Sequence, residues 1–473
     1  MHGGHNTPKG ITMQHTSTSG KTSTGRTTET TGHPGRRPLG TTETTFNPGI
    51  YKAGTKAKAP ESKQVELDTK ALQARTWERQ KAMWAITNIK ALAGCHRWRS
   101  GSSKGVSLKW ANNGSSRFAG LQNSNSVWAS PIPAVAIGKR RVQEATTAVK
   151  NWHDMHDNAS VLLLTLTLPH AHGTALKDSL EALKAGWAGI IGTTSWKKDR
   201  EAYRLPWWHK ALEITHGQNS FHPHFHVLLF CERTLSTTEV EALKARLFDR
   251  YAKRLEKHGW QRPSWEHGID LVQSTGRDDA IMMGAYTAKG IAESWNAASE
   301  VAGQAFKEAK GTNRTPWQIL DDIAAGAPGT PEYRRDVAIW REYEATTRGV
   351  KQTSWSTGAK KALSVNVLKD EDVATGEVLG EDEATEDYVV ADIPAKAWAE
   401  LCDDVHKRLD IANYVAKATT AKEAQQRAHK ILDLWGIEHR SVLLEVEAPG
   451  RVWKVATDES RALLAVDPGS TWL

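Results

Sequence analysis

The chain has 473 residues, of which 25% are charged and 39% hydrophobic, so it is long enough for several domains and can bury a large core. Its 62 lysines and arginines exceed its 54 acidic residues, and the formal net charge of +8 is compatible with a nucleic-acid partner. Three cysteines exclude a disulfide scaffold and a four-cysteine zinc site, and the lack of a signal-like amino terminus or of any run near ~18 apolar residues predicts a soluble, cytoplasmic protein with no membrane partner.

The first part of the chain is predicted to have little regular structure. Residues 1–63 are dominated by Thr, Ser, Gly and Pro without an apolar period, which indicates a disordered tail. Residues 64–150 are predicted to form an N-terminal helical and irregular region. Apolar residues recur at loosely helical spacing from Val65 to Arg99, residues 100–135 are rich in turn formers, and a second compact block begins near Glu144.

Residues 151–310 alternate strands with helices. Val161–Leu168 is a β-branched and aliphatic run ended by Pro169, which predicts a strand. An amphipathic helix is predicted after it, from apolar residues spaced four and three apart: Leu176, Leu180, Leu183, Trp187 and Ile190. Two further strands, Ala211–Thr215 and Phe221–Phe230, are joined by a polar turn and predict a hairpin.

Helix start signals mark the following segments. Ser236 and Glu239 predict a capping box at the start of a long amphipathic helix. Another helix is predicted from Asp278 to Trp295, and Thr315-Pro316 has the residue types of an N-cap and a first helical position. Strands followed by long helices predict an α+β fold with an antiparallel central sheet covered by helices.

Three more regions complete the predicted organisation. Residues 311–369 are interpreted as a helical extension of the block formed by residues 151–310. Residues 370–390 are interpreted as an acidic linker, because nine Asp and Glu fall within 370–387. Residues 391–473 contain two helical patterns and a strand, Ser441–Val446, and predict a small C-terminal α/β region.

The ten residues from Phe221 to Phe230, FHPHFHVLLF, carry three histidines at alternate positions. Alternate residues of a strand share a face, so His222, His224 and His226 project together. Core packing explains three such imidazoles poorly, because their ring nitrogens need partners, and one metal ion would serve them all. We therefore predict a metal site on this strand, although a lone histidine would more often be a buried structural residue.

The preceding strand offers a carboxylate to the same site. The segment ALEIT places Glu213 on the face of Ala211 and Thr215, and a hairpin would bring it beside the histidines. Two imidazoles and a carboxylate without a thiolate suit Mn²⁺ or Mg²⁺ with open water positions, and zinc is the alternative. The other interpretation of Glu213 is an ordinary solvated strand residue.

A candidate nucleophile lies in GAYTAKG (284–290), where Tyr286 and Lys289 are neighbours on one helix face. A free tyrosine has a pKa of about 10 and is mostly unreactive at neutral pH. A metal-polarised phosphate and an adjacent ammonium would both favour the phenolate. The YxxK pattern alone is weak, because it recurs at Tyr414 and Lys417, and an ordinary amphipathic helix is the alternative interpretation.

Taken in chain order, three segments resemble the three motifs of HUH endonucleases: VLLLTLTLPH, HPHFHVLLF and GAYTAKG. The similarity is greatest to the plasmid rolling-circle replication initiators (Rep proteins) of Gram-positive and actinobacterial hosts. It extends to NRTPWQILDD and WREYEATTRGVKQTSWSTG and covers residues 117–365. The order of the three motifs is specific, whereas any one motif alone is not.

The resemblance implies a role for each matching residue. His224 and His226 match the metal-ligating pair, with His222 as a further ligand or a support. Tyr286 matches the nucleophile, which attacks one DNA phosphate, keeps the 5′ end as a phosphotyrosine and releases a 3′-OH primer. Lys289 matches the lysine that accompanies this tyrosine.

The resemblance also implies partners. It implies the HUH endonuclease fold, a divalent metal (Mn²⁺ or Mg²⁺) and the DNA of a plasmid origin. A helicase and the replication machinery would come from the host, since the chain has no GxxxxGK[ST] phosphate loop of its own.

Two positions depart from the family pattern. Some relatives carry a glutamate four residues before the nucleophile that activates water at termination. Met282 stands there in this chain, which leaves the role absent or with Asp278, Asp279 or Glu293.

The second departure is the segment SNSVWASPIPA, which matches a cysteine-rich segment of many relatives. Ser124, Ser130 and Pro133 stand at the cysteine positions, so a zinc site is predicted to be lost and Trp128 to serve in packing.

The preferred function is that of a plasmid replication initiator, a site-specific endonuclease and strand transferase. A conjugative relaxase or a transposase-type HUH nuclease is one alternative, and the downstream TPWQILDD and WREYEATT segments argue against it. A catalytically degenerate plasmid DNA-binding regulator is a second alternative. A structural zinc protein is a third, made unattractive by the absence of cysteines near the histidines.

Overall fold

A computed structural model describes residues 62–101, 103–124, 126–169, 172–287, 313–366, 369–370, 373, 386–442 and 446–447. Apart from residues 62 and 63, the predicted tail lies outside the described residues, as does most of the predicted acidic linker. In the described ranges, no helix has the length and apolar character needed to cross a membrane.

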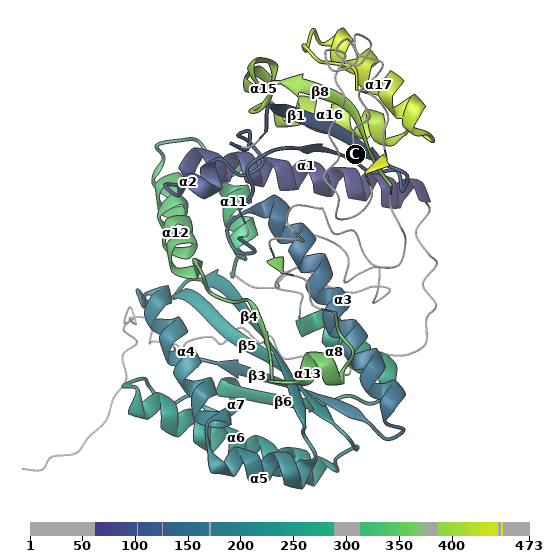
Figure 1. The fold of residues 1–473 in the computed structure, drawn as a ribbon. Coiled ribbons are helices and arrows are strands. Elements are labelled where there is room, and N and C mark those ends of the chain that lie inside the picture. Colours follow the sequence, from purple (N-terminus) through teal and green to yellow (C-terminus); the bar gives the residue numbers. More distant parts are fainter. Residues whose placement is uncertain are drawn as a thin grey trace, which may run out of the picture. The chain divides into compact units, whose positions relative to one another are not determined.

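The larger of two sheets has five antiparallel strands in the order β6-β3-β5-β4-β7. Their bounds are β3 Ser160–Thr167, β4 Trp207–Gly217, β5 Ser220–Cys231, β6 Ile269–Gln273 and β7 Thr353–Trp355. β4 and β5 form the predicted hairpin, closed by the two residues between Gly217 and Ser220, and lie side by side in Figure 1. The strand predicted at Val161–Leu168 is confirmed as β3.

Helices cover both faces of this sheet. They are α4 Leu176–Ile191 and α6 Thr237–Lys257 on one face and α3 Pro131–Met155 and α8 Arg277–Thr287 on the other. Because β3 is central, its alternate residues are buried on opposite faces. Leu162 and Leu164 pack with α4 and α6, whereas Val161 and Leu163 pack with α3 and α8. The α+β class with an antiparallel sheet covered by helices is confirmed.

Helix starts follow the predicted chemistry. Ser236 and Glu239 form a reciprocal capping box at the start of α6. Thr315 caps α11 Pro316–Ala325 in the same way, and its proline occupies the first position. The helix predicted from Asp278 to Trp295 is described up to Thr287, and the rest of it lies outside the described residues.

A second sheet has four strands in the order β2-β1-β8-β9. They are β1 Gly105–Ala111, β2 Ser116–Ala119, β8 Asp387–Pro394 and β9 Val446–Glu447, and the helices packed with them are α15 Ala395–Leu401, α16 Val405–Ala416 and α17 Ala421–Leu434. Since β1 pairs with β8, the predicted ranges 64–150 and 391–473 share one sheet. β8 also begins inside the predicted acidic linker.

The prediction of irregular structure across residues 100–135 is wrong. The segment contains the β1–β2 hairpin, and α3 begins at Pro131. Val106, Leu108 and Trp110 alternate along β1 and are buried. The hydrogen bonds on the other edge of β1 come from β8, which lies nearly 280 residues later in the chain, so this strand depends on a distant partner.

Six further helices lie in the described part of the chain. They are α1 Ser62–Ile86, α2 Lys90–Ala93, α5 Thr194–Tyr203, α7 Trp265–Gly268, α12 Pro331–Thr347 and α13 Ala359–Ala362. The helical pattern predicted from Val65 to Arg99 thus breaks after Ile86, and only the single turn of α2 follows before Gly94.

Candidate functional site

The strand register brings the predicted metal ligands to one face of the sheet. On β4 and β5, Glu213 lies directly opposite His224, and Ala211 lies opposite His226. Directly opposed residues of antiparallel strands project to the same face, which here is the face covered by α3 and α8. The hairpin predicted from the sequence is therefore what assembles this cluster.

Glu213, His224 and His226 form a group of candidate metal ligands, called the metal triad below. The Oε2 atom of Glu213 lies 2.8 Å from Nε2 of His224 and 2.9 Å from Nε2 of His226. Both histidines are buried, and Glu213 is partly exposed. Among the described residues, these three form the group of His, Cys, Asp and Glu whose ligand atoms converge closely enough to hold an ion.

The other ring nitrogens of the triad are anchored by neighbouring groups. Nδ1 of His224 lies 3.1 Å from the carbonyl oxygen of His222 and must donate to it, because a carbonyl can only accept. A neutral His224 therefore presents a lone pair on Nε2. Nδ1 of His226 lies 3.2 Å from the hydroxyl of Thr165 on β3. Such contacts to the second ring nitrogen are those that orient metal-ligating histidines.

The electrostatics of the triad favour an ionised carboxylate. Burial alone raises the pKa of Glu213, but the attraction and hydrogen bonds of His224 and His226 outweigh it and hold that pKa well below its usual value. Those hydrogen bonds need a proton on each Nε2 atom. When the imidazoles are instead neutral and present Nε2 lone pairs, the carboxylate and the two lone pairs face a common point and repel one another. A divalent cation between them relieves that repulsion, so this donor set fits a metal with nitrogen and oxygen ligands.

Tyr286 stands over the triad from α8. Its ring centroid lies 5.2 Å from that of His226, at an interplanar angle of 73°. The helix is held there by close contact with α3: a Cβ atom on Gly284 would lie 3.3 Å from the carbonyl oxygen of Ala145 and from a methyl of Val149. Gly284 thus sets how near Tyr286 approaches the sheet.

Two further predicted residues cannot be compared with this site. Lys289 and Glu293 lie outside the described residues. The predicted site residues that the structure brings together are therefore Glu213, His224, His226 and Tyr286.

His222 lies nearer the hairpin end, opposite Thr215. Its carbonyl oxygen supports His224, and its Nε2 lies 3.0 Å from where a Cβ atom of Gly217 would be. The side chain is not a member of the convergent group of ligand atoms.

Carboxylates at the start of α8 are far from Tyr286 along the helix. Asp279 accepts hydrogen bonds from the backbone N–H and the hydroxyl of Thr275, at 2.8 and 3.1 Å. Asp278 is exposed in the same turn. Seven or eight residues of helix separate them from Tyr286, a rise of about 10–12 Å.

The second YxxK copy belongs to a different environment. Tyr414 lies on α16, packs against the core of the second sheet and lies beneath the guanidinium of Arg427 at 5.2 Å. Tyr414 therefore has a packing role, as the interpretation of a YxxK pattern as part of an ordinary amphipathic helix would have it.

Sequence reasoning missed the support from β3. Thr165 and Thr167 lie opposite His226 and His224 in the register, on the same face as the triad. Both are polar residues within an aliphatic run, at the spacing that puts them on one face. This signal could have identified them before the structure was known.

The segment at the cysteine positions is well packed. Ser124 donates its backbone N–H, and Ser130 its hydroxyl, to the sulfur of Cys95, both at 3.2 Å. Trp128 is buried and donates its indole N–H to the carbonyl of Val350, so its predicted packing role is confirmed.

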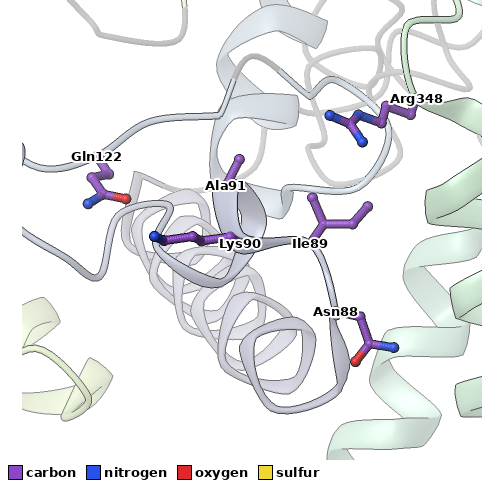
Figure 2. Close-up of a pocket in the computed structure, with 6 residues that line it drawn as sticks. All are labelled: Asn88, Ile89, Lys90, Ala91, Gln122 and Arg348. Carbon is purple, nitrogen blue, oxygen red and sulfur yellow. The ribbon is translucent and has the colours of Figure 1, made fainter.

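A separate cavity of about 560 Å³ lies at the connection between α1 and α2. Figure 2 shows Lys90 and Gln122 on one side of it and Arg348 on the other, with Asn88 below. None of its lining residues belongs to the metal triad, so the cavity has no part in the chemistry argued from the triad.

Comparisons with known proteins agree with the motifs. Residues 131–244 match a family described as "Replication protein", a range that includes the triad and ends before Tyr286. The "Protein rep" of Streptomyces lividans is 26% identical over 315 residues, which cover 56% of this chain and 68% of that protein. No solved structure matches. These similarities confirm the predicted resemblance to plasmid replication initiators of actinobacterial type.

Proposed function

We propose that this relative of plasmid replication initiators starts rolling-circle replication by nicking one strand of its plasmid's origin, with Tyr286 as the nucleophile. The observation that supports the proposal most is the convergence of Glu213, His224 and His226 on one point, with the ring of Tyr286 5.2 Å from that of His226. A two-histidine, one-carboxylate set beside a tyrosine suits attack on a phosphodiester.

The proposed reaction is a transesterification. The phenolate oxygen of Tyr286 attacks phosphorus, a bond from tyrosine to the 5′ phosphate forms, and the bond from phosphorus to the 3′ oxygen breaks. The departing 3′ oxygen takes up a proton and becomes the 3′-OH that primes synthesis. The phosphotyrosine conserves the energy of the broken bond, so no nucleotide hydrolysis is needed for the nick.

Each residue has a task in this reaction. Glu213, His224 and His226 would hold Mn²⁺ or Mg²⁺, and Thr165 and the carbonyl of His222 orient the two imidazoles. When bound, the ion acts as a Lewis acid on the scissile phosphate and neutralises charge in the transition state. Gly284 lets α8 pack closely on α3 and so positions Tyr286. The host would supply the helicase and the rest of the replication machinery.

The decisive experiment compares the wild type with Tyr286→Phe. Purified protein is mixed with Mn²⁺ and the supercoiled plasmid that encodes it, and denaturing gels are run with and without protease treatment. The wild type is expected to give nicked circles with a protease-sensitive 5′ adduct that EDTA abolishes. Tyr286→Phe should lose the adduct and keep DNA binding, because the variant lacks the attacking oxygen and retains the ring.

Tyr414→Phe is the matched control, since Tyr414 carries the same YxxK pattern on a different core. It should nick like the wild type. Persistent adduct in Tyr286→Phe would refute the assignment of the nucleophile. Binding without nicking by the wild type would instead support a degenerate DNA-binding regulator. His224→Ala should lower the nicking rate by two orders of magnitude or more, and unchanged activity at saturating Mn²⁺ would contradict its role as a ligand.

A further inference from the structure

An aromatic and cationic cluster lies on the surface formed by α6, α7 and the segment between them. We call it the Trp265 surface, and its members are Lys244, Phe248, Arg262 and Trp265. The Trp265 and Phe248 rings meet edge to face, with centroids 5.2 Å apart. Nζ of Lys244 lies 5.0 Å from the Trp265 ring, and the guanidinium of Arg262 lies 5.6 Å from the Phe248 ring. Trp265 remains 36% exposed, which is high for so large an apolar side chain.

The Trp265 surface lies at the β6 edge of the sheet, two strands from the strand that carries the triad histidines. The hydroxyl of Thr167 donates to the carbonyl of His267, at 2.7 Å, and Thr167 lies directly opposite His224. Trp265 is two residues before His267 in the single turn of α7. Two strand spacings of about 4.8 Å each, from β5 to β3 and from β3 to the chain at His267, and two residues of helix with a rise of about 3 Å therefore separate His224 from Trp265.

A second connection runs through β6. Asp270 lies opposite Thr165, which in turn lies opposite His226. Nζ of Lys244 lies 3.6 Å from the carboxylate of Asp270. Both rows of the sheet that contain the triad histidines thus end at the β6 edge, where Lys244 reaches Asp270 from α6 on the opposite face of the sheet.

The segment that carries Trp265 is rigidly folded. Ser264 caps α7 by accepting a hydrogen bond from the backbone N–H of His267. A Cβ atom on Gly268 would lie 2.4 Å from Pro263, so the chain is tightly packed on both sides of Trp265. An exposed indole held by such a segment is preorganised for a planar ligand, because little side-chain entropy remains to be lost on binding.

The charges of this surface largely cancel. Lys244 is paired with Asp270, and Arg262 with Glu256 at 2.9 Å. A bare phosphate backbone would therefore gain little here by charge attraction alone. The π-face of an unpaired base gains more, since stacking on an aromatic ring is tolerant of sequence and independent of charge.

We propose that Trp265 is a stacking platform for an unpaired base of the origin strand, at the β6 edge of the sheet two strands from the metal triad. The proposal rests on the proposed function and adds to it a residue that positions the origin strand from the β6 side of the site. The platform holds the strand so that its phosphate lies over the triad. Trp265 is thus a positioning residue and takes no part in bond breaking.

The test measures binding separately from nicking. Trp265→Leu keeps an apolar side chain against Phe248 but cannot stack, and Trp265→Phe restores an aromatic face. Fluorescence anisotropy in EDTA gives the affinity for a labelled single-stranded origin oligonucleotide and for the same sequence as a duplex. Trp265→Leu should bind the single strand about tenfold more weakly, which is within the range known for one base stacked on an aromatic side chain.

Three further results are expected from the same assay. Trp265→Phe should bind the single strand within about threefold of the wild type. Duplex affinity should change by less than about twofold in either variant. The slope of log affinity against log salt concentration should be unchanged, because no phosphate contact is removed.

Trp98→Leu is the matched control. Trp98 is also 36% exposed and also lies beneath a cation, the guanidinium of Arg97 at 6.0 Å from its ring, but it precedes β1 and belongs to neither row of the triad. It should bind single-stranded DNA like the wild type. Circular dichroism and thermal unfolding of every variant verify that each is folded.

The proposal is overturned if Trp265→Leu binds the single strand like the wild type, or if it loses single-strand and duplex affinity equally. Failure of the proposed function gives a different result. In that case no protein nicks the plasmid with Mn²⁺, yet the affinity difference between Trp265→Leu and Trp265→Phe persists in EDTA.

Discussion

The contact between Gly284 and α3 makes the position of the proposed nucleophile, Tyr286, sensitive to a single methyl group. A Cβ atom at residue 284 would lie 3.3 Å from the carbonyl oxygen of Ala145 and 3.3 Å from a methyl of Val149. The valine side chain can adjust, but the carbonyl is fixed in the backbone of α3. We therefore expect Gly284→Ala to displace α8 from α3 by a few tenths of an ångström.

The expected effect on the reaction follows from that displacement. A misplacement of 1 Å in a reacting group can cost about a hundredfold in rate, so 0.3–0.5 Å corresponds to a loss of about four- to tenfold. Stability should change by less than about 1 kcal/mol, because replacing glycine in a helix interior gains about as much as the tight contact costs. The rate and the stability of the variant should thus respond differently.

The assay is a single-turnover measurement of adduct formation with saturating Mn²⁺ and protein in excess of a labelled origin strand. Urea unfolding followed by circular dichroism gives the free energy of unfolding. Gly276→Ala is the matched control, since Gly276 directly precedes α8 and a Cβ atom there would meet nothing within 4 Å. It should leave the rate unchanged.

Equal rates for Gly284→Ala and the wild type would refute the idea that this contact sets the height of Tyr286 over the triad. A bulkier variant extends the test. Gly284→Val adds branching at the same contact and should lower the rate further, with a loss of about 1–3 kcal/mol in stability from overpacking. A rate that recovers in Gly284→Val would be incompatible with the proposed geometry.

Two more predictions concern titratable groups. Glu213→Gln should weaken Mn²⁺ binding at least about tenfold, because the triad loses its negative charge. Isothermal titration calorimetry on the DNA-free protein measures this affinity, with Glu239→Gln as the control. Equal affinities for Glu213→Gln and the wild type would contradict the ligand role of Glu213. His209→Leu should reduce the acid sensitivity of folding. Burial, helped by Arg141 and Lys360, lowers the pKa of His209 from 6.5 to about 3, so its contribution to stability is present above pH 6.5 and is lost as the pH falls toward 3. By pH 5 the loss is about 2 kcal/mol, and urea unfolding at pH 7.5 and pH 5 should show a smaller difference in His209→Leu than in the wild type.

Local patterns carried the prediction of the triad. Alternation along a strand placed His224 and His226 on one face, and a short polar turn predicted a hairpin that carries Glu213 to them. Both inferences need only the period of a strand and the length of a turn. This is why the register of β4 and β5 agrees with the prediction.

Contacts between distant segments could not be predicted in the same way. Nothing local in β1 indicates that its partner is β8, and its turn-rich surroundings led to the wrong prediction of irregular structure. The close packing of Gly284 on Ala145 depends on how two helices cross, which their separate periodicities do not specify. Thr165 is an intermediate case. The sequence shows that Thr165 and Thr167 share a face of their strand, but the contact of Thr165 with His226 could be predicted only from the order of the strands in the sheet.

The pairing of β1 with β8 has a consequence for how the protein is made. A ribosome delivers the chain from its amino end, and all strands of the five-stranded sheet have been synthesised once residue 355 is complete. β1 and β2 are synthesised before that sheet, yet β8, the strand that pairs with β1, is synthesised only with residues 387–394. Until then β1 is paired with β2 on one side only, its other edge is apolar and unpaired, and such edges recruit other chains. Truncated messenger RNAs, or ribosomes that stall before β8 is made, should therefore yield nascent chains that need chaperones more than the full-length protein does.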